Sequence, residues 1–329
     1  MMSDASRPLL VTHSGNFHCD EAFAYVVLRL ALGLREAGLD HDLVRTRDAD
    51  TIARGDVVWD VGLTFDAAAH RFDHHQRGAP VREDGTPFSA AGLVWQRYGV
   101  DAVRALLTAN DATTDASMAD PIAAEVERVL VRRIDEVDNG VAENRDPLDL
   151  AALVGDCNPS WDAPRGGTKA AAQAAEDAAF LRAVALLDGV LRRRVESLRA
   201  CLAADALVVA AQAASADPRV LELDRGMPWK GAVFAHALPV LFAVFPASNG
   251  NWMLDSMPPE PKSFAQRLPL PESWAGLQDA ALAEASGVPD AVFVHLRRFV
   301  GAARTRDGAL AMARRTIALA QEAGALPAD

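Results

Sequence analysis

Residues 12–21 read THSGNFHCDE and place two histidines and two carboxylates within ten residues. The apolar run before them predicts a short buried strand over 7–13. The residues after them, DEAFAYVVLRLALGLREA, carry apolar side chains on a broad face and predict a helix over 20–37, closed by Gly38. The stretch is therefore a strand-to-helix loop, and its histidines and acids are typical metal ligands.

Two further strands are predicted at 41–47 and 56–61, with a short helix near Asp50 between them. Strands that alternate with helices pair in parallel, which predicts a doubly wound sheet. Ligands bind beyond the carboxyl ends of such strands, so residues that follow the first and third strands can meet although about 40 positions separate them. We therefore expect four side chains to converge there: His13, His18, Asp20 and Asp60.

The second half of the chain has a different pattern. After predicted helices at 89–98 and 121–137, an alanine-rich segment from Lys169 to about Ala204 predicts a connecting helix or helix pair. Beyond it we expect a hairpin turn at 248–251 (SNGN) and a closing amphipathic helix at 307–323. Strands are predicted at 206–211, 220–223, 239–245, 252–255 and 291–296.

These elements predict an α/β protein with an N-terminal doubly wound parallel sheet, a smaller C-terminal α+β lobe, and a cleft between them. We expect an N-terminal domain over 1–165, a helical connector over 166–204 and a C-terminal lobe over 205–329.

The composition limits the function. The 329 residues are 50% hydrophobic, which is typical of a globular protein, and they carry a net charge of −12. Such a chain lacks the broad basic surface that grips duplex nucleic acid, but bound divalent metals can supply positive charge locally. Three cysteines are too few for a disulfide framework. No run approaches the length of a membrane span and the N-terminus has no targeting pattern, so we expect a cytoplasmic protein without membrane contact.

A second cluster, HRFDHHQR, occupies residues 70–77. A single histidine is usually a packing or surface residue, and that interpretation stands for His41, His70 and His236. The cluster together with the first loop instead gives the mixed imidazole and carboxylate set that suits manganese, iron or zinc.

Two ions need a bridging carboxylate, and Asp60 is the natural bridge. One more carboxylate is needed for the second ion. Asp138, in EVDNG, is the best candidate, although DNG alone is also a turn signal.

Four motifs in this order carry a resemblance to a known family. They are His-x4-His-x-Asp-Glu at 13–21, Asp-Val-Gly at 60–62, Asp-His-His-Gln-Arg at 73–77 and Val-Asp-Asn-Gly at 137–140. The chain resembles the melanocyte-proliferating-gene (MYG-type) family of metal-dependent hydrolases, within the DHH phosphoesterase superfamily. The resemblance continues through SAAGL at 89–93, NPSW at 158–161, PWK at 228–230, RLPLP at 267–271 and RTRDGAL at 304–310.

This resemblance implies a DHH-type metal-binding catalytic domain at 1–165 and a substrate-binding lobe at 205–329. It also implies two divalent ions, for which we expect Mn²⁺, with Fe, Co, Zn or Mg as alternatives. One ion would be held by His13, His18 and Asp60, and the other by Asp20, Asp60, His74 and Asp138.

The resemblance implies substrate contacts as well. His75 would donate a hydrogen bond to a phosphate oxygen, Asp73 would orient the histidine pair, and Arg77 would lie near the phosphate or at the surface. With Asp60, His75 and Asp73 form the expected catalytic set. The C-terminal lobe would contribute four candidates, each of which is equally compatible with an ordinary surface charge: Lys230, Arg267, His295 and Arg304.

One segment departs from the family pattern. Where the family has Phe-x-Gly-Gly-His-Arg-Thr, residues 299–305 read FVGAART. Loss of a glycine and a histidine alters the substrate end of the second lobe, so the family's chemistry transfers to this chain more securely than its exact substrate.

The function that the resemblance implies is 3′-to-5′ exonucleolytic cleavage of single-stranded RNA, with a metal-bound hydroxide attacking at a two-metal site. The alternative keeps the metals but acts on a small phosphoester or phosphoanhydride, such as a short oligonucleotide, a cyclic dinucleotide or pyrophosphate. The 6% aromatic content favours that alternative slightly, because single-strand binders stack bases on aromatic side chains. A non-catalytic, metal-stabilised scaffold is the weakest hypothesis.

Overall fold

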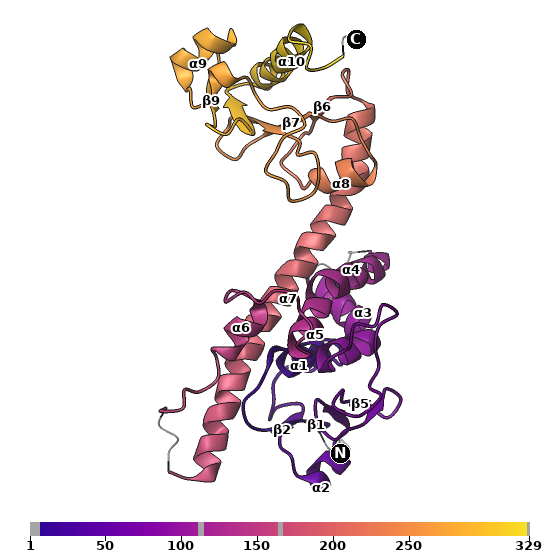
Figure 1. Cartoon of the computed structure of the whole chain (residues 1–329). Coiled ribbons are helices and arrows are strands. Elements are labelled where there is room, and N and C mark those ends of the chain that lie inside the picture. Colours follow the sequence, from indigo (N-terminus) through magenta and orange to yellow (C-terminus); the bar gives the residue numbers. More distant parts are fainter. Residues whose placement is uncertain (1–6, 111–114, 164–166, 328–329) are drawn as a thin grey trace. The chain divides into compact units, whose positions relative to one another are not determined.

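The computed structural model describes residues 7–110, 115–163 and 167–327 (Figure 1). The chain divides into two compact units, one ending at Leu198 and the other beginning at Arg199. Each unit combines helices with a five-stranded mixed sheet, which confirms the predicted α/β class. Within the described ranges, no helix combines the length and the apolar character that crossing a bilayer requires.

The sheet of the first unit has the order β2-β1-β3-β5-β4. Its strands are β1 (Leu9–Thr12), β2 (Asp42–Arg45), β3 (Val57–Trp59), β4 (Phe65–Asp66) and β5 (Arg71–Phe72). The first four in that order pair in parallel, whereas β4 runs antiparallel to β5. A short turn suffices to join β4 to β5, and only antiparallel neighbours can be joined so tightly. The sheet is therefore mixed and not wholly parallel.

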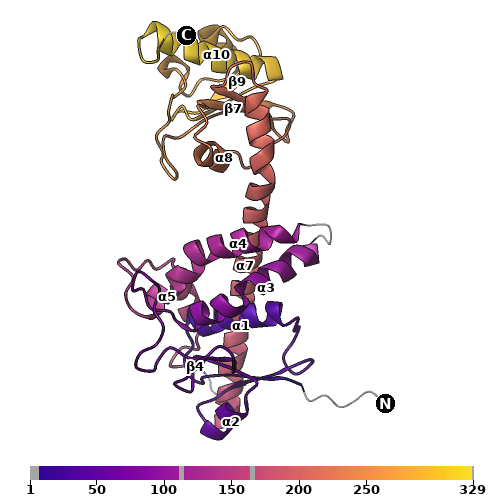
Figure 2. The same cartoon turned by 90° about the vertical axis from the view of Figure 1, so that its right-hand side faces the viewer.

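The helices of this unit lie on both sides of the sheet (Figure 2). They are α1 (Cys19–Ala31), α2 (Ala49–Arg54), α3 (Ala90–Asn110), α4 (Ala119–Val126), a π-helical turn (Glu127–Val131), α5 (Arg132–Asp138) and α6 (Leu150–Gly155). Alternate strand residues point to opposite faces: Leu10 and Trp59 join the main core with α1 and α3, while Val11 and Val58 pack beside Ile52 of α2. α1 ends before the predicted residue 37 because the chain turns at Gly33, whose φ is +66°.

α7 (Lys169–Ala213) is one continuous helix that contributes to both cores. Phe180 and Leu187 belong to the core of the first unit, and Val208 belongs to a cluster of the second. The strand predicted at 206–211 is therefore wrong. Its β-branched residues lie in an alanine-rich run without glycine or proline from 190 to 217, and helix propensity prevails over such a run.

The second unit has the sheet order β6-β7-β8-β10-β9, in which only β6 and β7 are parallel. Its elements are β6 (Val220–Glu222), α8 (Lys230–Ala235), β7 (Phe242–Pro246), β8 (Trp252–Ser256), α9 (Asp279–Ser286), β9 (Ala291–Val294), β10 (Val300–Ala303) and α10 (Arg306–Glu322). The hairpin predicted at 248–251 joins β7 to β8, and Gly250 adopts a φ of +88° in its turn.

Candidate metal centre

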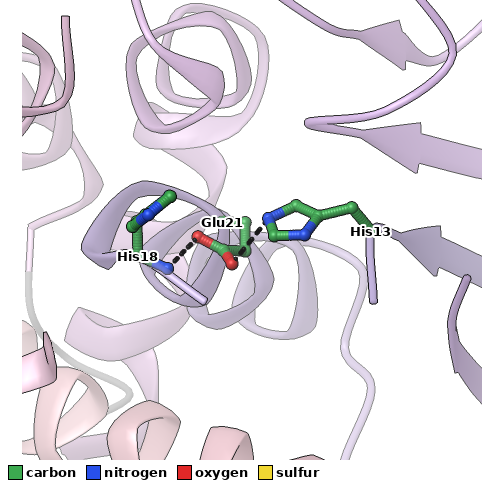
Figure 3. Close-up of side chains that lie close together, drawn as sticks. All are labelled: His13, His18 and Glu21. Atoms are coloured by element: carbon green, nitrogen blue, oxygen red, sulfur yellow. Dashed lines mark hydrogen bonds and ion pairs between the residues drawn. The ribbon is translucent and has the colours of Figure 1, made fainter. Parts of the chain in front are cut away.

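His13 follows β1 directly and is 3% exposed. Its Nε2 atom lies 2.9 Å from Oε1 of Glu21 and 3.2 Å from Oδ2 of Asp60. Figure 3 shows the Glu21 carboxylate between the His13 ring and the backbone of His18. The carboxyl end of β1 therefore presents an imidazole to two buried acids.

The first turn of α1 supplies two of the carboxylates. The backbone N–H of His18 donates to Oε2 of Glu21 at 2.8 Å, a contact that caps the helix and fixes the glutamate. Asp20 is fully buried, and its Oδ2 accepts a hydrogen bond from the backbone N–H of Ala90, at the start of α3, at 3.3 Å. The negative side chains lie where the positive end of the helix dipole favours them.

Asp60 occupies the centre of the cluster. It follows β3 with a left-handed backbone conformation, φ +56°, which is uncommon for a residue other than glycine. Its Oδ2 faces His13, and its Oδ1 lies 3.2 Å from Nε2 of His74. The same His74 atom lies 3.4 Å from Asp138 and 3.8 Å from Asp20.

The structure thus brings together the six residues predicted as metal ligands. Together with Glu21 and His75, these six residues form four overlapping groups, and the ligand atoms of each group lie within 4.8 Å of one another. The groups are His13, His18 and Glu21; His18, Asp20 and Asp138; Asp20, Glu21 and Asp60; and Asp60, His74 and His75. Adjacent parallel strands explain the meeting of the β1 and β3 ends, and α5 delivers Asp138 at its last residue.

Asp73 and His75 form a pair beside this cluster. Oδ1 of Asp73 lies 2.7 Å from Nδ1 of His75 and accepts the backbone N–H of His74 at 2.8 Å, while Oδ2 accepts the N–H of Leu63 at 2.6 Å. The His75 side chain is 54% exposed, whereas Asp73 is buried. One imidazole is therefore held rigidly while part of its ring faces solvent.

Burial and neighbouring charges shift the pKa values of several side chains in the cluster. Burial acts to lower the pKa of His13, but contacts with Asp60 and Glu21 raise it to about 10. Burial acts to raise the pKa of Asp60, but hydrogen bonds with His13 and His74 lower it to about 2. Burial first, and then the charges of Asp60 and Asp138, raise the pKa of Asp20 well above its usual range.

The cluster fits a divalent cation. Three buried carboxylate oxygens of the cluster make no well-aligned hydrogen bond within the described residues: Oδ1 of Asp20, Oε1 of Glu21 and Oδ1 of Asp60. The last two lie close only to ring nitrogens, which a metal ion can share with them. Buried carboxylates without donors are costly unless a positive charge offsets them. Imidazole nitrogens together with carboxylate oxygens are the donor set of manganese, iron and zinc sites.

Glu21 was not among the predicted ligands. It is fully buried and lies closer to His13 than Asp60 does. Its place directly after Asp20, at the third position of a helix, was the signal in the sequence, because that position can reach back to the helix cap.

The remaining predicted substrate residues have different surroundings. Arg77 is exposed, two positions after His75. In the second unit, Lys230 and His295 line one pocket of about 500 Å³. The Arg267 guanidinium instead donates to the carbonyls of Leu238 and Val240, at 2.9 and 3.0 Å, and Arg304 pairs with Asp279 at 3.1 Å.

Comparison with known proteins identifies relatives along nearly the whole chain. The family model described as "Uncharacterised protein family (UPF0160)", with the short name MYG1_exonuc, matches residues 9–317. A human protein named "MYG1 exonuclease" is 36% identical over 94% of this chain and 86% of its own length. A bovine protein of the same name is also 36% identical, over 94% and 85%, and a Dictyostelium discoideum "MYG1 protein" is 32% identical, over 96% and 97%. No solved structure matches the chain.

Proposed function

Because the chain belongs to the MYG1 family, we propose that it is a metal-dependent phosphodiester hydrolase of the DHH type, acting as a 3′-to-5′ exonuclease on single-stranded RNA. The observation that carries the proposal is the position of Asp60, whose two oxygens face His13 and His74 at 3.2 Å each. A carboxylate between two imidazoles is suited to bridge two cations. The human and bovine relatives are named as exonucleases, which supports nucleic acid as the substrate.

We assign two divalent ions, with Mn²⁺ as the expected metal, to two sets of residues. One set is His13, His18 and Asp60, to which Glu21 adds a carboxylate beside His13, and the other is Asp20, Asp60, His74 and Asp138. Bound there, the ions would lower the pKa of a water molecule and neutralise charge on the phosphate. The backbone N–H of Ala90 holds Asp20 in place, and that of His18 holds Glu21.

The residues around the metal set handle the substrate. His75, whose Nδ1 is held by Asp73 and whose side chain is 54% exposed, donates a hydrogen bond from its other ring nitrogen to a phosphate oxygen. Arg77 is the nearby cation along the chain that can meet the same phosphate. A hollow of about 260 Å³ is lined by His18, Asp138 and Arg145, and it offers a position for the sugar and base of the terminal nucleotide.

The test is hydrolysis of single-stranded RNA labelled at either end, with added Mn²⁺. Wild type should release labelled mononucleotides immediately from 3′-labelled RNA and shorten 5′-labelled RNA progressively. Asp60→Asn and His74→Gln should lose this activity, whereas Asp50→Asn, an exposed control on α2, should keep it. Release of mononucleotides from the 5′ label alone would reverse the proposed polarity.

A second candidate substrate is a small phosphoester or phosphoanhydride. The hollow beside the metal set has room for about one nucleotide, and the chain carries a net charge of −12. A series of RNA lengths, with bis-p-nitrophenyl phosphate and pyrophosphate alongside, separates the two. Activity that vanishes as the RNA lengthens would favour the small substrate. Metal binding without hydrolysis of any substrate would support the third hypothesis, a non-catalytic, metal-stabilised scaffold.

A further inference from the structure

One arginine contacts the residues assigned to the two ions, the metal set, from outside it. Arg47 lies two residues after the end of β2, and its Nη2 atom is 3.2 Å from Nδ1 of His13. Among the described residues, no other arginine or lysine hydrogen-bonds to a member of the metal set. Because β3 is the central strand in the order β2-β1-β3-β5-β4, Arg47 after β2 and His75 after β5 lie on opposite sides of Asp60.

The charge of Arg47 has no acidic partner within the part of the chain that the structure describes. Its side chain is exposed, and the carboxylate next along the chain, that of Asp48, caps α2 instead. Arg45 shows what a structural arginine looks like at the same strand end. Its guanidinium is buried, lies 4.9 Å from the centre of the Phe180 ring and donates to the carbonyl of Gly15. Arg47 makes no comparable packing contact with the described residues, so its cation is available to an anion.

Nδ1 of His13 has two neighbours that it cannot serve at once. The carbonyl oxygen of Ser14, at 3.1 Å, requires a proton on Nδ1, whereas Arg47 only donates and requires the lone pair there. The other ring nitrogen, Nε2, lies among the ligand oxygens of Glu21 and Asp60. A histidine that binds a metal through one nitrogen donates the proton of the other, commonly to a backbone carbonyl. With Nε2 as the ligand atom, His13 donates to Ser14 and leaves Arg47 without that acceptor.

The balance of charge indicates what the released guanidinium meets. The metal centre contains four carboxylates, enough to offset two divalent ions: Asp20, Glu21, Asp60 and Asp138. The negative charge of a bound phosphate therefore has to be met by cations of the protein. A guanidinium is planar and can donate to two phosphate oxygens at once, which suits it to this task.

We propose that Arg47 binds the phosphate group that is cleaved, from the side of the metal set opposite His75. Its exposed side chain exchanges Nδ1 of His13 for phosphate oxygens by a change of rotamer. This inference rests on the proposed function, since it adds a substrate contact to the same site. It concerns the phosphate and neither base nor sugar, so it applies to RNA and to small phosphoesters alike.

The test is calorimetric titration of inorganic phosphate into the Mn²⁺-loaded chain. Arg47→Gln should weaken phosphate binding about 10- to 100-fold, the usual effect of losing hydrogen bonds to a charged group. Arg47→Lys should recover part of the affinity, because it restores the charge but not the planar fork. Arg54→Gln is the matched control and should bind phosphate as wild type does. Arg54 is also exposed, lies on α2, and among the described residues hydrogen-bonds only to Thr51.

Mn²⁺ affinity in the absence of phosphate separates a phosphate contact from a merely structural role. The paramagnetic resonance signal of free Mn²⁺ gives the dissociation constant for each variant. If Arg47 binds phosphate, Arg47→Gln should keep the wild-type Mn²⁺ affinity or raise it slightly, because a nearby positive charge is removed. If Arg47 only holds the His13 ring, the variant should bind Mn²⁺ and phosphate more weakly together, and that result would overturn the inference.

Hydrolysis of single-stranded RNA distinguishes failure of this inference from failure of the proposed function. Wild-type phosphate affinity in Arg47→Gln, in a chain that trims RNA, would overturn the inference and leave the exonuclease intact. Phosphate binding that depends on Arg47, in a chain that cleaves bis-p-nitrophenyl phosphate but not RNA, would support the inference and refute the exonuclease. A Mn²⁺-loaded wild-type chain that binds no phosphate would also overturn the inference.

Discussion

The Nδ1 atom of His75 lies 2.7 Å from Oδ1 of Asp73. Burial acts to raise the pKa of Asp73, but the contact with His75 and backbone N–H groups lower it below its usual value. The aspartate is therefore ionised and holds one ring nitrogen of His75, while the His75 side chain is 54% exposed. The pair has the geometry of a carboxylate that sets the orientation and tautomer of a histidine.

Replacement of Asp73 by Asn should reduce RNA hydrolysis about 10- to 100-fold, because the amide holds His75 less firmly in its orientation. The metal content should change little, since Asp73 lies outside the ligand groups. Steady-state kinetics and metal analysis of the same preparation check both points. His75→Gln should show a similar loss, and the double variant should be little worse than either single one. Additive losses would contradict a shared role.

The metal set predicts a stability that depends on metal. Burial and the charges of Asp60 and Asp138 raise the pKa of Asp20, so the crowded carboxylates destabilise the metal-free chain. Mn²⁺ at about 100 times its dissociation constant should raise the free energy of unfolding by about 2.7 kcal/mol. Asp20→Asn should lose most of this gain without destabilising the metal-free protein. Denaturant titrations with Mn²⁺ and with EDTA measure both, and a full gain in Asp20→Asn would remove Asp20 from the ligand set.

The pKa of His13 predicts how the metal-free stability varies with pH. Contacts with Asp60 and Glu21 outweigh burial and raise this pKa from 6.5 to about 10. The folded chain then keeps a proton that the unfolded chain has released, so the contribution is complete below pH 6.5 and is lost as the pH rises to about 10. One such proton corresponds to about 1.4 kcal/mol per pH unit. Unfolding of the metal-free protein should show this fall, and His13→Gln should lessen the slope by about that amount.

Much of the first unit follows from local sequence. The strand-to-helix loop at 12–21 is predictable because an apolar run, a dense polar stretch and an amphipathic segment follow one another within one βα unit. The proximity of His13 and Asp60 needs only the pairing of β1 with β3 in parallel. Glu21 was missed because its role depends on which way a side chain in the first helical turn points, and sequence spacing leaves that open.

The second unit was harder to predict. β10 reads VGAA, which has little β propensity, and it is a strand because β8 and β9 pair with it on both sides. The run at 206–211 shows the opposite case. Its β-branched residues favour a strand, but they belong to the long helix α7. The proximity of Lys230 to His295 depends on long-range pairing, and no local pattern indicates it.

The last prediction concerns the start of α3, where the carboxylate of Asp135 accepts hydrogen bonds from the backbone N–H groups of Ser89 and Gly92, at 3.1 and 3.0 Å. Arg82 donates to the other oxygen at 2.6 Å. A methyl group added at Gly92 would lie 2.1 Å from Oδ2 of Asp135 and 2.7 Å from the Phe88 ring, and both neighbours are buried. Gly92→Ala should therefore destabilise the protein by about 1–3 kcal/mol, the usual cost of overpacking.

Gly189→Ala is the matched control for Gly92→Ala. Gly189 also lies inside a helix, α7, but no atom lies within 4 Å of an added methyl group there. Alanine should stabilise that position by about 0.5–1 kcal/mol, because glycine loses more backbone entropy in a helix. Chemical denaturation of both variants measures the contrast. A neutral Gly92→Ala would mean that α5 can shift away from α3, and a shift of α5 would displace Asp138 from His74, so the same variant should then show weakened Mn²⁺ binding.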